Sequence, residues 1–134
     1  MIFVTGPRFS GKRTYMQKAL GLSDEAFARK ASCEVQELLR KKEGQEDSVR
    51  RVAELADALC RCEIVTASET GSGVIPVDAD ERAFREAAGR LSCLLAERAD
   101  VVIRMCCGLP EILKGEEIFT TCAKRPDRTT GEKQ

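Results

Sequence analysis

Short apolar runs alternate along the chain with longer stretches in which apolar residues recur every three or four positions. The first short run, from Ile2 to Thr5, is β-prone and ends at Gly6 and Pro7. The segment from Lys12 to Leu20 then has helical spacing, and Gly21 follows it as a stop signal. Short apolar runs predict strands, and the longer period predicts helices. The chain is therefore predicted to begin with a strand, a loop and a helix.

A second helical stretch follows, with Ser23 as a suitable N-cap. Apolar residues at helical spacing continue beyond it, but the segment from Ala31 to Val35 also fits a short buried strand. Periodicity leaves both interpretations open. The residues that share the helical spacing are Phe27, Ala31, Val35, Leu38 and Leu39.

The second half of the chain repeats this alternation after a charged, glycine-containing break at residues 41–47. It contains two predicted amphipathic helices, of which the second is opened by Asp78 and Glu81 in a capping arrangement. Gly71, Gly73 and Pro76 mark the loop before that helix. The predicted elements are a helix from Val49 to Cys60, a strand from Ile64 to Ala67, a helix ending near Arg98, a buried strand from Val101 to Cys107, and an edge strand from Ile118 to Thr121.

Short strands that alternate with amphipathic helices are typical of α/β proteins. We expect a mostly parallel sheet flanked by helices on both faces, which makes three layers. The 134 residues fit a single domain, which we assign to residues 1–121. Residues 122–134 are polar and are expected to form a flexible C-terminal tail.

Composition excludes several classes of function. The chain has 22 basic and 22 acidic residues and a net charge of zero, so nucleic acid and anionic membranes are not expected partners. No run approaches the roughly 18 apolar residues of a membrane span, and no signal peptide is apparent, which favours a cytoplasmic protein. Histidine is absent, which excludes Ser/His/Asp triads, Cys/His nucleophile pairs and histidine-bearing zinc sites.

The seven cysteines are odd in number and irregularly spaced, so we interpret them as reduced thiols. Cys60 and Cys62 form one close pair, and Cys106 and Cys107 form another, but neither pair has the C-x-x-C spacing of a metal or redox site. Both pairs lie in or beside apolar runs, and adjacent strand residues face opposite ways. We therefore predict that they pack in the core and that the chain has no metal site.

The segment from Gly6 to Lys12 fits the phosphate-loop motif G-x-x-x-x-G-K, between the first predicted strand and the first predicted helix. In such a loop, backbone N–H groups and the helix N-terminus bind phosphate, and the lysine reaches the β- and γ-phosphates. The alternative is an ordinary turn with a solvated Lys12. The predicted nucleotide-binding residues are Gly6, Pro7, Arg8, Phe9, Ser10, Gly11, Lys12, Arg13 and Thr14.

The position after the lysine departs from the motif. A Ser or Thr hydroxyl normally binds Mg²⁺ there, but the chain has Arg13, and Thr14 points about 100° away around the helix. Either Mg²⁺ binding is weakened, or the charge of Arg13 takes the place of the metal.

Three later segments share a pattern with the loop. Residues 68–76 read S-E-T-G-S-G-V-I-P, residues 82–100 contain R-A-F-R followed by G-R and end in A-D, and residues 108–114 read G-L-P-E-I-L-K. In this order, and with T-G-P-R-F-S-G-K-R at residues 5–13, they resemble the adenosylcobinamide kinase/adenosylcobinamide-phosphate guanylyltransferase family of cobalamin biosynthesis. The likeness covers residues 1–20 and about 62–114.

This resemblance implies a P-loop NTPase-like fold and transfer of a phosphoryl group from ATP or GTP to a hydroxyl of adenosylcobinamide, with Mg²⁺. It also implies a homotrimer. Besides Lys12, the candidate catalytic residues are Glu34, which matches the family's Walker-B-like acidic residue on a strand, and Glu69. Glu69 follows the Ile64–Ala67 strand at the ligand-binding edge of a parallel sheet, although a solvated turn residue is the alternative.

The chain also departs from the family. Members are longer after the first helix, and the missing segment would carry the histidine that becomes guanylylated. Without histidine, guanylyl transfer by that route is not expected, whereas kinase activity is not excluded. A second function stays open, that of a non-catalytic regulatory or carrier subunit that binds nucleotide or a corrinoid. Arg82 and Arg85 are expected to be exposed ion-pair partners, and contact with phosphate or a neighbouring subunit is the alternative.

Overall fold

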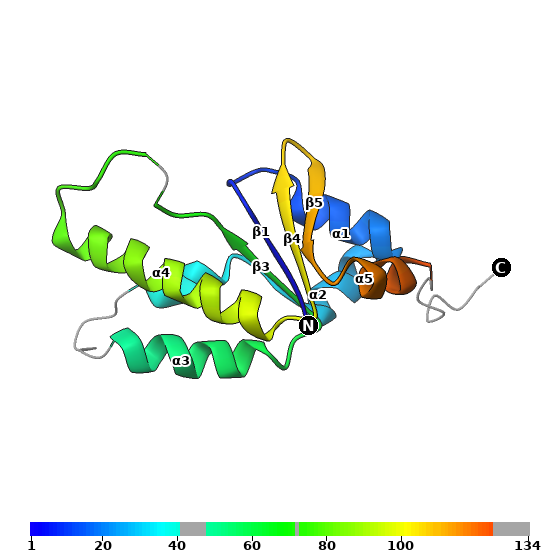
Figure 1. The fold of residues 1–134 in the computed structure, drawn as a ribbon, viewed down its shortest axis with the longest axis horizontal. Helices are drawn as coiled ribbons and strands as arrows, with labels where there is room; N and C mark the ends of the chain where they lie inside the picture. Colours follow the sequence, from blue (N-terminus) through cyan, green and yellow to red (C-terminus); the bar gives the residue numbers. More distant parts are fainter. Residues whose placement is uncertain (41–47, 72, 125–134) are drawn as a thin grey trace.

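The computed structural model describes residues 1–40, 48–71 and 73–124. In these ranges one five-stranded sheet has the order β2-β3-β1-β4-β5 (Figure 1). The first four strands are parallel, and β5 is antiparallel to β4. The mostly parallel sheet confirms the α/β class. The strands are β1 (Ile2–Gly6), β2 (Ala31–Ser32), β3 (Ile64–Ser68), β4 (Val101–Cys106) and β5 (Leu109–Lys114).

Helices cover both faces of the sheet, which gives the predicted three layers (Figure 1). Neighbouring strand residues face opposite ways, so Phe3 packs toward α3 and α4 while Val4 packs toward α1, α2 and α5. Both faces are buried, as is usual for parallel sheets. The helices are α1 (Lys12–Leu20), α2 (Asp24–Lys30), the 3₁₀ helix η1 (Val35–Leu39), α3 (Ser48–Leu59), α4 (Ala79–Arg98) and α5 (Glu116–Ala123).

The helix ends follow local sequence signals. Helix α1 ends at Gly21, which has a left-handed φ of 65°. The Ser23 side chain accepts a hydrogen bond from the Ala26 N–H and caps α2, and Asp78 caps α4 through the Asp80 N–H. These boundaries confirm the predicted helices at 12–20 and after Ser23, and the end of the long helix at Arg98.

The ambiguous stretch after Phe27 divides into two elements. Helix α2 ends at Lys30, and Ala31 and Ser32 then pair with Ile64 and Val65 of β3 as a very short parallel strand. After Glu34, the helical spacing of Val35 to Leu39 belongs to the separate element η1. The strand interpretation was therefore correct at its start, and the single long helix was wrong.

The predicted edge strand from Ile118 to Thr121 is wrong, because these residues lie in α5. The edge strand is β5. Cys107 and Gly108 both have positive φ values, 51° and 77°, as in a tight two-residue hairpin turn. Cys107 and Gly108 thus reverse the chain onto β4, and Pro110 lies in β5, because proline is tolerated on an edge strand.

All seven cysteines are free thiols, and the prediction that the paired cysteines pack in the core is wrong for Cys106 and Cys107 but holds in part for Cys62, which packs against the core. Cys106 and Cys107 are exposed because the buried part of β4 ends at Met105, where the hairpin turn begins. Cys60 and Cys62 are half-buried after the end of α3.

Two predicted segments fall largely outside the described residues, namely the charged break at 41–47 and the tail beyond residue 124. Helix α5 includes Cys122 and Ala123, the first two residues of the expected tail. Within the described ranges, no helix is long and apolar enough to cross a membrane. In the same ranges, no group of three or more His, Cys, Asp or Glu residues is arranged to hold a metal ion.

Candidate functional site

The loop between β1 and α1 lies at the carboxyl end of the central strand, where parallel sheets bind ligands. Gly6 has a φ of 149°, and a Cβ atom there would overlap the Met105 carbonyl oxygen of the neighbouring strand β4. Gly11 and Phe9 have left-handed φ values of 87° and 61°. The Phe9 side chain is 97% exposed, so the backbone rather than this ring shapes the loop.

The β4–β5 turn braces the loop from one side. The Gly108 N–H donates to the Ser10 carbonyl oxygen at 3.0 Å, and inside the loop the Ser10 N–H donates to the Pro7 carbonyl oxygen at 3.2 Å. Ser10 is only 7% exposed, yet its buried hydroxyl has no partner in the part of the chain that the structure describes. A buried polar atom without a partner requires an explanation, and a bound phosphate oxygen would supply one.

Lys12 is buried at the start of α1, with 6% of its surface exposed. Its ammonium donates to the Pro7 carbonyl oxygen at 3.0 Å, to the Gly6 carbonyl oxygen at 3.4 Å and to the Ser68 hydroxyl at 3.1 Å. The Glu34 carboxylate lies 3.7 Å from it. Lys12 is therefore folded into the loop and does not fit the alternative of a solvated turn residue.

The family likeness predicted that Glu34 lies on a strand. It lies instead in the connection between β2 and η1, where its φ is left-handed at 51°. Its N–H donates to the Thr66 hydroxyl at 3.2 Å. Its Oε2 accepts hydrogen bonds from the Ser68 hydroxyl at 2.6 Å and from the Gln36 amide at 2.8 Å. Burial raises the pKa of Glu34, but these bonds and the charges of Lys12 and Arg8 outweigh it, so the net pKa is lowered.

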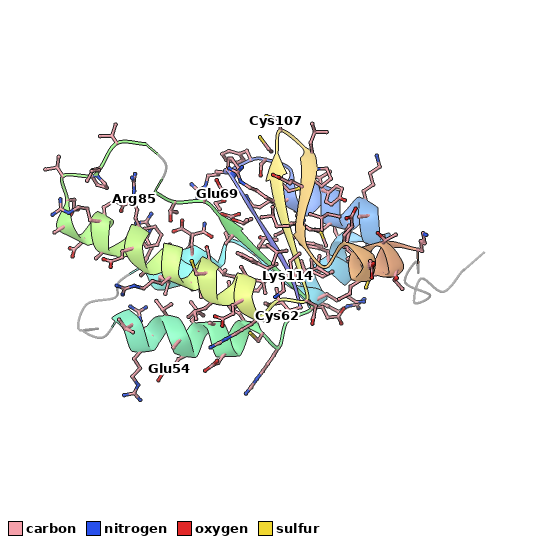
Figure 2. The ribbon with its side chains drawn as sticks, viewed as in Figure 1. Glu54, Cys62, Glu69, Arg85, Cys107 and Lys114 are labelled. Atoms are coloured by element: carbon pink, nitrogen blue, oxygen red, sulfur yellow. The ribbon has the colours of Figure 1, made fainter. Side chains whose placement is uncertain are left out.

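Glu69 follows β3 at the same end of the sheet, as predicted (Figure 2). Its N–H donates to the Gly6 carbonyl oxygen at 2.9 Å. Both carboxylate oxygens accept hydrogen bonds from Arg104 on β4, at 2.7 and 3.2 Å. These bonds hold the pKa of Glu69 below its usual value. Glu69 is thus an ion-paired residue and not the solvated turn residue of the alternative.

Arg13 turns toward α2. Its guanidinium donates to the Asp24 carboxylate at 3.1 Å and lies over the Phe27 ring, 5.3 Å from the ring centre. The neighbouring Thr14 is exposed on α1. Arg8 lies on the other side of the loop, 3.4 Å from a carboxylate oxygen of Glu37.

Two hollows lined by described residues lie beside the loop. One, of about 540 Å³, is lined by residues of α1 and by Gly108 of the hairpin turn. The other, of about 230 Å³, lies beside Ser68 and Glu69 and extends to η1 and α4. The second hollow borders Ser68, whose hydroxyl accepts a hydrogen bond from Lys12.

Sequence reasoning missed three residues that organise this region, Ser68, Gln36 and Arg104. Arg104 had a signal, because a charged residue interrupts an otherwise apolar strand. Ser68 lies at the first position of a segment that shares the family pattern, whereas Gln36 had no signal beyond its proximity to Glu34. The expectation of ion pairs for Arg82 and Arg85 was also wrong.

Arg82 and Arg85 donate instead to backbone carbonyls of the loop before α4. Arg82 reaches the Pro76 and Val77 oxygens at 2.9 and 2.8 Å. Arg85, labelled in Figure 2, reaches the Val74 oxygen at 3.0 Å. Both side chains thus attach α4 to the loop before it.

Comparison with known families identifies the fold. A family model described as cobinamide kinase / cobinamide phosphate guanyltransferase matches residues 30–113, more than half of the chain. The chain belongs to this family. The match confirms the resemblance, and with it a P-loop α/β fold and a connection to cobalamin biosynthesis. Glu34 and Glu69 lie within the matched residues, and the loop from Gly6 to Lys12 precedes them. No curated protein matches the chain.

Proposed function

We propose that this member of the cobinamide kinase family transfers a phosphoryl group from ATP or GTP to a hydroxyl of a corrinoid such as adenosylcobinamide. One observation carries the proposal. The buried ammonium of Lys12 and the unpaired buried hydroxyl of Ser10 lie in one loop, with the Glu34 carboxylate 3.7 Å from that ammonium. Anion-binding groups and an acidic group are thus adjacent, as phosphoryl transfer requires.

The loop provides the phosphate site in this proposal. Backbone N–H groups between Phe9 and Arg13, together with the Ser10 hydroxyl, would donate to phosphate oxygens. The Lys12 ammonium would exchange the Pro7 and Gly6 carbonyls, which it now contacts, for the stronger charge-assisted bonds to the β- and γ-phosphates. The nucleoside would occupy the hollow of about 540 Å³ beside Thr14 and Tyr15.

The acceptor would enter the second hollow, beside Ser68 and Glu69. A space of about 230 Å³ admits a hydroxyl-bearing side chain but not a corrin ring, which would remain outside. The acceptor oxygen bonds to the γ-phosphorus as the bond from that phosphorus to the β-γ bridging oxygen breaks, and a nucleoside diphosphate leaves. Glu34, ionised at neutral pH, would orient the hydroxyl and accept its proton.

Oxygen donors suited to Mg²⁺ are present in Glu34 and Ser68, which would hold the ion if it binds here. A bound Mg²⁺ would neutralise part of the negative charge of the nucleotide phosphates. Arg13 cannot replace the usual hydroxyl ligand. The guanylyl transfer named in the family description is not part of the proposal, because the chain has no histidine to carry a guanylyl group.

The engagement of Arg13 by Asp24 and Phe27 favours a second candidate function. With no hydroxyl after Lys12, weak metal binding would leave a protein that binds nucleotide or a corrinoid without transferring phosphate. Such a protein would act as a regulatory or carrier subunit.

Calorimetric titration with ATP and with GTP, each with and without Mg²⁺, tests the proposal. Removal of the charged donors in Lys12→Ala is expected to weaken nucleotide binding about 10- to 100-fold. Lys124→Ala, which removes a lysine at the exposed end of α5, is the matched control and should bind as wild type does. Transfer is then measured as the mass gain of one phosphoryl group on adenosylcobinamide.

The outcomes separate the two functions. Transfer that is lost in Lys12→Ala supports the kinase. Lys12-dependent binding without transfer supports the non-catalytic subunit and contradicts the kinase. A folded wild-type protein that binds neither nucleotide contradicts the kinase and restricts the second function to binding of a corrinoid.

A further inference from the structure

Gln36 is the most deeply buried polar residue near Lys12, with 1% of its surface exposed. It lies in η1, and both ends of its amide have partners. The amide nitrogen donates to Glu34 Oε2 at 2.8 Å, and the amide oxygen accepts from the Ser68 N–H at 3.0 Å. Only this orientation of the amide works, because a carboxylate needs a donor and a backbone N–H needs an acceptor. Gln36 therefore links Glu34 to the end of β3.

Glu34 needs such support. Its left-handed φ of 51° is unfavourable for a residue with a Cβ atom, and neighbouring contacts must hold it. The Thr66 hydroxyl holds its N–H, while Gln36 and Ser68 hold its side chain. Thr66 and Ser68 both belong to β3, and Gln36 is itself bound to Ser68. The backbone and the carboxylate of Glu34 are thus fixed to one strand.

The bonds from Gln36 and Ser68 also decide which carboxylate oxygen is available. Both go to Oε2, and the oxygen nearest the Lys12 ammonium is Oε1, at 3.7 Å. Gln36 and Ser68 are neutral donors, so they fix the carboxylate without cancelling its charge. Arg104 binds both oxygens of Glu69, in contrast, and opposes the charge of that carboxylate.

We infer that Gln36 is a positioning residue for the proposed transfer, because it holds the Glu34 carboxylate with Oε1 toward Lys12. The inference rests on the proposed function, since transfer is its readout. The side-chain hydrogen bonds of Gln36 go to Glu34 and to Ser68 rather than to the phosphate loop, so Gln36 acts through Glu34. Loss of its bond should lower the rate of transfer more than the affinity for nucleotide.

Gln36→Glu is the sharpest test. It keeps the shape of the side chain and an acceptor for the Ser68 N–H, but it replaces the donor that faces Glu34 with a second carboxylate oxygen. We expect kcat to fall about 10- to 100-fold, as for a reacting group displaced by about an ångström, with nucleotide Kd changed about threefold or less. Gln36→Met, which removes both bonds at similar volume, gives a second variant if Gln36→Glu does not fold.

Gln17 offers a matched control. It also donates from its amide to a carboxylate, that of Asp24 at 2.8 Å, but from the side of α1 that faces α2. Gln17→Glu makes the same chemical change there, and its kcat should stay within about twofold of wild type. Kinetics, calorimetry and thermal unfolding are measured for all variants below their unfolding temperatures.

Each outcome is decisive. A selective loss of kcat in the Gln36 variants supports the inference. Unchanged kcat, or a loss of kcat matched by an equal loss of nucleotide affinity and a lower unfolding temperature, overturns it in favour of a structural role. A wild-type protein that transfers no phosphate overturns the proposed function itself, and that result is seen before any variant is made.

Discussion

Two glutamates lie at the carboxyl end of the same sheet in different surroundings. Around Glu34, the partners are a buried serine and a buried glutamine, with Lys12 nearby. Around Glu69, the partner is an exposed arginine that binds both carboxylate oxygens. The first region holds a carboxylate with neutral donors, and the second holds one with an opposite charge.

This difference shows that position along a parallel strand is not enough to identify a reactive carboxylate. Both residues satisfy the rule that ligands bind at the carboxyl ends of strands. The Glu34 carboxylate lies 3.7 Å from the Lys12 ammonium of the phosphate loop, whereas both carboxylate oxygens of Glu69 are bound by Arg104. We therefore propose that Glu34 takes part in the transfer and that Glu69 borders the hollow in which the acceptor would bind.

The largest expected effect comes from removing each charge in turn. Glu34→Gln should lower kcat for transfer to adenosylcobinamide about 100-fold or more, the usual contribution of a general base. Glu69→Gln should instead raise the KM for the acceptor and leave kcat within a few-fold of wild type. Steady-state kinetics of both variants make the measurement. A large loss of kcat in Glu69→Gln, with kcat little changed in Glu34→Gln, would instead favour Glu69 as the reactive carboxylate.

A smaller effect is expected from the glycines of the two regions. Gly6→Ala places a methyl group against the Met105 backbone oxygen, which should cost about 1–3 kcal/mol and lower the unfolding temperature by several degrees. Gly71→Ala, two residues after Glu69, has a positive φ of 108° but no neighbour within 4 Å, so it carries only backbone strain. Differential scanning calorimetry compares them. Equal losses would mean that close packing beneath the loop is unimportant.

The smallest effect concerns acid and salt. The pKa values of Glu34 and Glu69 are lowered in the folded protein, so each contributes stability above its unfolded pKa near 4.5 and loses it as the pH falls through the lower folded value. The exposed pair of Glu69 and Arg104 should contribute about 1 kcal/mol or less and weaken in 1 M salt. The contribution of Glu34 should resist salt better, because neutral donors supply much of it.

Thermal unfolding at pH 3.5 to 7 in low and high salt, with Glu34→Gln and Glu69→Gln as references, separates the two contributions. The salt dependence of the unfolding temperature should be lost in Glu69→Gln and kept in Glu34→Gln. The opposite result would contradict the distinction between neutral and ionic partners.

Much of the fold follows from local signals. The first strand, the loop, helix α1 and its stop at Gly21 lie where the sequence indicated, because glycines and apolar spacing act within a few residues. Strand β5 was missed because its residues are mostly exposed and it is stabilised by pairing with β4, which is a tertiary effect. The core prediction failed for Cys106 and Cys107 for a similar reason, since apolar character does not show where a strand leaves the core.

The site was predictable only in part. The motif indicated Lys12, and the family likeness indicated Glu34 and Glu69, but none of these patterns gave their partners. Ser68 and Gln36 lie 32 residues apart and meet only because β3 and η1 are neighbours in the fold. Sequence spacing carries no information on such a contact, so the unequal surroundings of the two glutamates required the structure.

The hydrogen bond from the Gly108 N–H to the Ser10 carbonyl oxygen joins the loop to a hairpin almost one hundred residues further along the chain. Fraying of the edge strand β5 would therefore release the loop, and a ligand that orders the loop would in turn suppress that fraying. Slowed amide hydrogen exchange at Gly108 would then report nucleotide binding from the opposite end of the sequence, and the conformational entropy lost on binding would be shared between the two segments.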